Sequence, residues 1–168
     1  MTTPWSGSVT PVGPPASAVP TLRDLIYAGV VTGSWSSLLS LIVYGFARLI
    51  GVPFEVAVPG SSDLQQVPWF VMLVVPLAAA LIGALLASLA LGRTHAQRLV
   101  FWIGTAIAVA SLASPLIQPA SVEWSSRLWL VIPHAITWFL VVPQIARIAG
   151  DSQPGNFVLQ PTGEASSS

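Results

Sequence analysis

Three side chains can form polar contacts inside segments that are otherwise apolar: Tyr44, Arg48 and His134. His134 lies in LWLVIPHAITWFLVVPQIAR, residues 128–147, where an imidazole in lipid needs a hydrogen-bond partner. Tyr44 and Arg48 are four residues apart and therefore share one face of a helix. We predict an intramembrane polar cluster in which Tyr44 bonds His134 and Arg48 reaches the outer surface, with Glu55 as a partner for Arg48.

Two interpretations of this cluster stay open. In the first, His134 and Arg48 line a small outward-facing polar pocket that holds a ligand, a lipid headgroup or a proton. In the second, His134 makes an interhelical contact and Arg48 extends its guanidinium to the interface.

The rest of the sequence offers little for catalysis. Cysteine is absent, which excludes disulfides and thiolate chemistry. There is no glycine-rich phosphate loop, no HExxH and no plausible Ser–His–Asp set. His95 and His134 fall on opposite predicted sides of the membrane and cannot share a metal. We therefore expect no enzyme activity, no cofactor and no metal.

The composition points to lipid as the main solvent. The chain has 168 residues, of which 54% are hydrophobic and 7% charged, against roughly 25% charged in an average soluble domain. Six positive charges balance six negative ones, so nothing indicates a nucleic-acid partner. The expected partners are the bilayer and other membrane protein subunits.

Four long apolar runs cover about residues 25–50, 69–91, 99–118 and 128–149. Each approaches the roughly 20 residues that a helix needs to cross a bilayer. We predict an all-α fold, an integral membrane four-helix bundle of antiparallel spans over residues 21–149. Residues 1–20 and 150–168 are rich in Pro, Ser, Thr and Gly and are predicted to be disordered tails. Thr21 and Asp24 have the spacing of a capping box.

The arginines predict the orientation. One side carries Arg23, Arg93, Arg98 and Arg147, and the other carries Arg48 and Arg127. By the positive-inside rule, this is a multi-pass cell-membrane protein with both termini in the cytoplasm. The short polar link over residues 91–98 predicts that the second and third helices are antiparallel neighbours.

Small residues predict where helices approach closely. The first helix has Gly29 and Gly33 at a spacing of four. The second has two such ridges, Ala79–Gly83–Ala87 and Ala80–Ala84–Ser88. We predict close packing at Gly29, Gly33 and Gly83, because small residues let helix backbones meet in lipid.

Two stretches carry a family resemblance: YGFARLIGVPFEV, residues 44–56, and IPHAITWFLVVPQIAR, residues 132–147. Over about residues 22–149 the chain resembles a bacterial, mostly actinobacterial, family of four-helix membrane proteins designated domain of unknown function 6069. The resemblance implies a membrane location and four helices, with no assigned activity. His134 and Arg48 match recurring polar positions of that family.

The resulting functional prediction is a membrane protein without catalytic chemistry, a small accessory or interaction subunit of a membrane assembly. The alternative is a small-ligand-binding or transporter-like module that uses the outward-facing pocket near His134 and Arg48.

Overall fold

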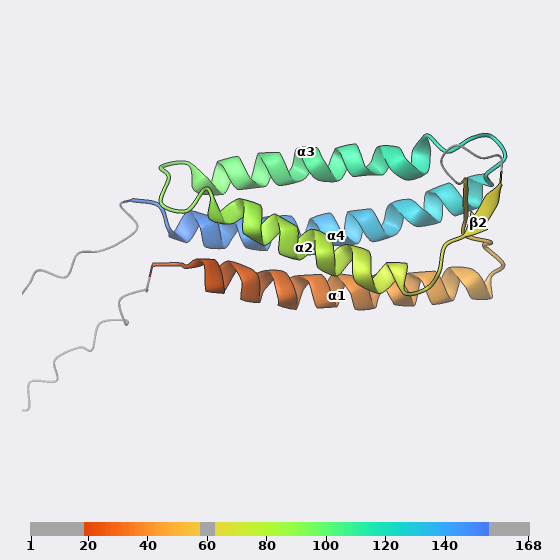
Figure 1. The fold of residues 1–168 in the computed structure, drawn as a ribbon, viewed down its shortest axis with the longest axis horizontal. Coiled ribbons are helices and arrows are strands. Elements are labelled where there is room, and N and C mark those ends of the chain that lie inside the picture. Colours follow the sequence, from red (N-terminus) through yellow and green to blue (C-terminus); the bar gives the residue numbers. More distant parts are fainter. Residues whose placement is uncertain (1–18, 58–62, 155–168) are drawn as a thin grey trace, which may run out of the picture.

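The computed structural model describes residues 19–57 and 63–154, which form four long helices and one short hairpin (Figure 1). The helices are α1 (Leu22–Leu49), α2 (Val71–Ser88), α3 (Ala96–Leu116) and α4 (Trp124–Asp151). Between α1 and α2, β1 (Glu55–Ala57) pairs antiparallel with β2 (Leu64–Gln66). The predicted four-helix fold is confirmed, whereas the hairpin was not predicted.

All four helices are long and apolar enough to cross a membrane. The shortest, α2, has 18 residues, which at 1.5 Å per residue gives about 27 Å, close to the roughly 30 Å of a bilayer core. Residues 1–18 and 155–168, which hold most of the predicted tails, lie outside the described residues. α4 continues through Asp151, two residues into the predicted second tail.

Both ends of α1 follow local sequence signals. The Asp24 carboxylate accepts hydrogen bonds from the backbone N–H and the hydroxyl of Thr21, both at 2.8 Å. This is the capping contact that the Thr21–Asp24 spacing predicts. After the helix, Gly51 has φ of +91°, a left-handed conformation that glycine adopts without steric cost.

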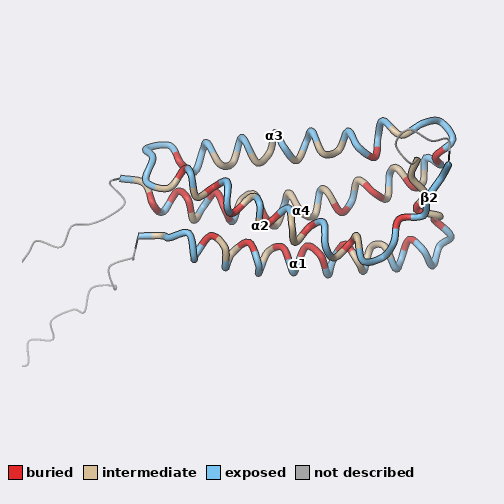
Figure 2. Tube along the Cα trace, in the orientation of Figure 1, coloured by how far each residue is buried: buried red, intermediate tan, exposed pale blue. Residues whose placement is uncertain are grey.

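The helices pack unevenly. α1 packs along α2 and α4, whereas α3 packs closely on α4 alone and hardly touches α2. Figure 2 shows the consequence: α3 is exposed or half-buried along nearly its whole length, and its buried residues are Ala96 and Pro115. The second and third helices, predicted to be antiparallel neighbours, therefore do not pack on each other. They are antiparallel but diverge from the turn that joins them (Figure 1).

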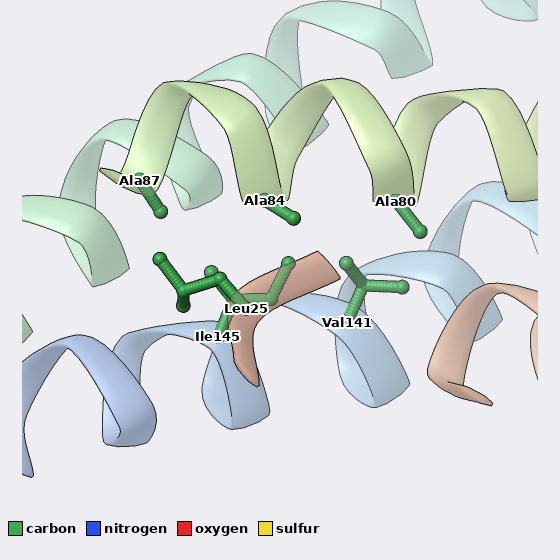
Figure 3. Packing of buried hydrophobic residues seen from close by; sticks show 6 residues of the cluster. All are labelled: Leu25, Ala80, Ala84, Ala87, Val141 and Ile145. Atoms are coloured by element: carbon green, nitrogen blue, oxygen red, sulfur yellow. The ribbon is translucent and has the colours of Figure 1, made fainter. Parts of the chain in front are cut away.

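The contact between α1 and α2 brings the two backbones close together. A Cβ atom added to Gly33 would lie 2.8 Å from the Cβ of Ala80, and one added to Gly29 would lie 3.1 Å from the Cβ of Ala84. The same face of α2 continues onto Leu25 of α1 and onto α4, as Figure 3 shows for the cluster Leu25, Ala80, Ala84, Ala87, Val141 and Ile145.

Gly83 does not share this role. A Cβ atom added there would meet only the Cδ1 of Ile145, at 3.8 Å, which is ordinary contact. The close packing predicted at Gly83 is wrong because the ridge of α2 that meets α1 is the neighbouring one, with Ala80 and Ala84.

The hairpin caps one end of the bundle, here called the hairpin end; the opposite end, with residues 89–95, is the turn end. Beneath the hairpin lies a second apolar cluster: Ala47, Val52, Phe54, Val67, Met72 and Leu130. Phe54 is fully buried and its ring centroid is 4.6 Å from that of Tyr44. Two hydrogen bonds also connect the hairpin to the end of α3 and the start of α4. Ala57 N–H donates to Gln118 Oε1 at 3.0 Å, and Glu55 N–H donates to Ser126 Oγ at 3.4 Å.

Candidate functional site

The hydrogen bond of His134 is local. Its Nδ1 lies 2.8 Å from the carbonyl oxygen of Leu130, one turn earlier in α4. Leu130 is three residues before Pro133, in the turn that proline distorts because it lacks an N–H and its ring crowds the preceding turn. The imidazole thus supplies a donor to a carbonyl in the proline-distorted turn, as side chains do in membrane helices.

In α2 a carbonyl in the turn before a proline also accepts a side-chain hydrogen bond, and here Ser37 of α1 provides the donor. The Ser37 hydroxyl donates to the carbonyl of Leu73 at 2.6 Å, three residues before Pro76. This bond also joins α1 to α2. At Pro76 and Pro133 a side chain thus adds a hydrogen bond to a carbonyl in the turn before the proline, which is one way in which membrane helices tolerate proline.

The predicted polar cluster does not form as expected. The Tyr44 hydroxyl donates to the carbonyl of Val67 at 3.0 Å, below the hairpin, and not to His134. Arg48 donates through Nη1 to the carbonyl of Pro53 at 3.1 Å, beyond the C-terminal end of α1. The predicted Tyr44–His134 bond is wrong, because each group binds a nearer carbonyl, and Arg48 likewise bonds backbone instead of Glu55.

His134 instead lines a groove between α2 and α3, with α4 as its floor. The groove has a volume of about 870 Å³ and is lined mainly by apolar side chains. Because α2 and α3 hardly touch, it opens sideways between them, toward the region that lipid occupies. Val56 and Val67 of the hairpin close one end, and Ala90 and Arg93 lie at the turn end. Arg48 is not among its lining residues, so the predicted pocket shared by His134 and Arg48 is wrong.

The groove has few polar side chains, and most of them are already bonded. Thr137 donates to the carbonyl of Pro133 and contacts the Ser36 hydroxyl, both at 2.8 Å. The Gln118 amide donates to the carbonyl of Ser114 while its oxygen accepts from the hairpin. Ser111 donates to the carbonyl of Ala108 at 2.7 Å. Within the described ranges, Nε2 of His134 remains without a hydrogen-bond partner.

Part of this site could have been found from the sequence. Ser111 and Ser114 are three residues apart, which places them on one face of α3, and Gln118 follows four residues later, just past the end of the helix. All three line the groove. Polar faces were predicted for the first and last helices only, so this one was missed.

The arrangement is suited to binding. Ligand sites are typically concave, mostly apolar and equipped with a small number of placed polar groups. Across the described segments, no group of three or more His, Cys, Asp or Glu side chains is placed to hold a metal ion. What the groove offers is a long apolar surface and one imidazole nitrogen.

These features define a multi-pass membrane protein with four apolar helices and a short hairpin at one end of the bundle. The chain belongs to the family of unknown function DUF6069, whose model matches residues 20–151. That range contains the four helices, the hairpin and the whole groove. No curated protein and no solved structure matches the chain. The predicted family membership is confirmed, whereas the bacterial origin that the resemblance implied stays a prediction.

Proposed function

We propose that the protein is a non-enzymatic membrane protein that binds an apolar or amphiphilic small molecule within the bilayer, in the groove between α2 and α3. The observation that carries the proposal is the groove itself, with about 870 Å³ between two helices that do not close on each other. That volume lies within the roughly 300–1,000 Å³ of small-molecule sites. Its lateral opening gives direct access to a ligand dissolved in lipid.

The test fills the groove without disturbing the bundle. Gly83 lines the groove, and its nearest contact leaves room for a side chain. Gly83→Leu therefore places an isobutyl group in the binding volume. Gly45→Leu is the matched control, because Gly45 is exposed on α1 with nothing within 4 Å of an added Cβ.

Both variants and the wild type are purified in mild detergent, and retained small molecules are extracted and quantified by mass spectrometry. The wild type and Gly45→Leu should retain one compound in stoichiometric amount, and Gly83→Leu should lose most of it. Equal retention by all three proteins, or retention of bulk phospholipid alone, would contradict the proposal.

A second candidate is an interaction subunit of a membrane assembly, which the bare surface of α3 favours. Large apolar side chains of α3 are more than half exposed: Trp102, Ile103, Ile107 and Val109. A helix of a partner subunit could cover them. Stoichiometric co-purification of a second membrane protein, lost on Trp102→Ala and Val109→Ala together, two positions that do not line the groove, would favour this function over ligand binding.

We further propose that both termini face the cytoplasm. In support, the fold gathers Arg23, Arg93, Arg98 and Arg147 toward the turn end, and Arg48 and Arg127 toward the hairpin end. Single cysteines at Gln65 and His95 test this, because both positions are exposed and the native chain has no cysteine. In intact cells an impermeant thiol reagent should modify Gln65→Cys and spare His95→Cys. The reverse pattern would overturn the orientation.

A further inference from the structure

We infer that the ligand of the groove is a long-chain molecule that donates a hydroxyl hydrogen bond to Nε2 of His134. This inference rests on the ligand-binding function proposed above and names the chemical class of the ligand. It follows from the protonation of the ring, from the polar atoms at the same level of the groove, and from the depth of that level.

The Leu130 contact determines which ring nitrogen carries the proton. A carbonyl oxygen can only accept a hydrogen bond, so Nδ1 of His134, at 2.8 Å from it, must be the donor. In a neutral imidazole the other nitrogen is then an acceptor. Nε2 therefore presents a lone pair, and within the described part of the chain nothing donates to it.

A charged imidazole at membrane depth is costly unless an acidic group or water compensates it. The groove lining contains no aspartate or glutamate, and its one permanently charged residue is Arg93, at the turn end. The groove thus offers His134 as an acceptor that requires a donor from the ligand.

The facing helix adds a second acceptor at about the same level. α3 and α4 are antiparallel, and Trp138, one turn after His134, donates to Thr105 of α3 at 3.1 Å. This register places Ser111 of α3 near the level of His134. Because the Ser111 hydroxyl already donates to Ala108, it faces the groove as an acceptor as well. A ligand hydroxyl suits this level, whereas an ether or ester oxygen would face two lone pairs.

The depth of His134 separates this ligand from ordinary phospholipid. Ten residues separate Trp124, the first residue of α4, from His134, a distance of about 15 Å along the helix. Acyl tails carry no hydrogen-bond donor at that depth. Beyond His134 the apolar lining continues along α4 to Ile145, about 16 Å further, which accommodates a long alkyl or isoprenoid chain.

The experiment compares a long-chain alcohol with its methyl ether. The full-length protein, in phosphatidylcholine nanodiscs, is photolabelled with hexadecan-1-ol that carries a mid-chain diazirine, and labelled peptides are mapped by mass spectrometry. Unlabelled hexadecan-1-ol and hexadecyl methyl ether then compete. Labelling should fall on the faces of α2 and α3 that line the groove, and the alcohol should compete at least about threefold better, as one membrane hydrogen bond implies.

Two variants at His134 test whether Nε2 of this residue causes the preference for the alcohol over the ether. His134→Asn keeps an amide donor near the position of Nδ1 and removes the acceptor at Nε2, so the preference for the alcohol should vanish. His134→Gln retains an acceptor near the position of Nε2 and should keep the preference. A preference that persists in His134→Asn would overturn the inference.

The failures are distinguishable, and the comparison within the wild type does not depend on how well the variants fold. Equal competition by alcohol and ether at the groove of the wild type would overturn the hydroxyl contact and leave the proposed binding function intact. If the diazirine alcohol does not label the groove, the binding function and the inference fail together.

Discussion

α2 meets its two antiparallel neighbours along the chain in opposite ways. Against α1 it brings Ala80 and Ala84 onto Gly29 and Gly33, so closely that an added Cβ atom would collide. Toward α3 it leaves a groove of about 870 Å³. Both faces of α2 are apolar, and hydrophobicity alone does not distinguish them.

The difference shows what holds helices together in lipid. Burying apolar surface between helices gains little there, so close packing and hydrogen bonds decide which helices meet. The α1–α2 contact has both, with two glycines and the Ser37–Leu73 bond. The α3–α4 contact also has both: a Cβ added to Gly104 would lie 3.0 Å from Val142, and Trp138 bonds Thr105. Between α2 and α3 the described residues show neither, and the helices stay apart.

The largest loss of stability should come from a side chain at Gly33, because α2 packs directly against this glycine. In Gly33→Leu the new Cβ would lie 2.8 Å from the Cβ of Ala80 and 3.2 Å from the Cα of Leu77, so a backbone must move. Overpacking of this kind costs about 1–3 kcal/mol and occasionally more. Thermal unfolding in detergent should show a clear loss of stability, with Gly45→Leu unchanged as the control. An unaffected melting temperature in Gly33→Leu would remove the close-packed contact.

Two buried serines of α1 should differ in how much their replacement by alanine changes the free energy of unfolding, and this difference should be smaller than the effect of Gly33→Leu. Ser37 donates to the Leu73 carbonyl, whereas the buried hydroxyl of Ser40 has no partner among the described residues. Ser37→Ala should lower the free energy of unfolding by about 1 kcal/mol, since it removes a hydrogen bond between α1 and α2. Ser40→Ala removes an unsatisfied hydroxyl and should be neutral or slightly stabilising.

The serine comparison has a further control in Pro76. If Ser37 matters because it serves the proline-distorted turn of α2, the cost of Ser37→Ala should shrink in a Pro76→Ala background, where the helix restores its own hydrogen bonds. Equal cost in both backgrounds would show that Ser37 acts only through packing between α1 and α2.

On the other face of α2, Gly83→Leu should hardly change stability. The position opens into the groove, with its nearest contact at 3.8 Å. Glycine inside a helix is also less favourable than alanine by roughly 0.5–1 kcal/mol, so the substitution removes a small intrinsic cost. The melting temperature should therefore stay the same or rise slightly. A loss as large as that of Gly33→Leu would mean that α3 closes on α2 and that the groove is filled by protein.

The sequence contains the information for the four helices and for the start of α1. Long apolar runs predict the spans, and the Thr21–Asp24 pair predicts a cap that the structure contains. The hairpin could not be predicted, because β1 and β2 have only three residues each and depend on contacts with distant helix ends.

The orientation of α2 also could not be read from one sequence. Two small-residue ridges run side by side on it, one containing Gly83 and one containing Ala80 and Ala84. Choosing between them requires knowing which face meets α1. The wrong prediction of a Tyr44–His134 bond has a similar origin. A partner for His134 was expected on another helix, but the imidazole bonds a carbonyl within α4, in the turn before Pro133.

The smallest expected effect is an absence of coupling between Tyr44 and His134. Their hydrogen bonds go to the carbonyls of Val67 and Leu130, so the two side chains share no acceptor. In a double-mutant cycle with Tyr44→Phe and His134→Ala, the free energies of unfolding should add to within about 0.3–0.5 kcal/mol.

The matched positive cycle is Ser36→Ala with Thr137→Val, because these hydroxyls are 2.8 Å apart across α1 and α4. Direct pairs in membrane proteins couple by about 0.6 kcal/mol on average and up to about 1.7. Coupling above about 1 kcal/mol between Tyr44 and His134 would exceed the additivity error and place the imidazole against α1. Nε2 would then be occupied by Tyr44, and the groove between α2 and α3 would lose the acceptor that distinguishes it from a simple gap filled by lipid.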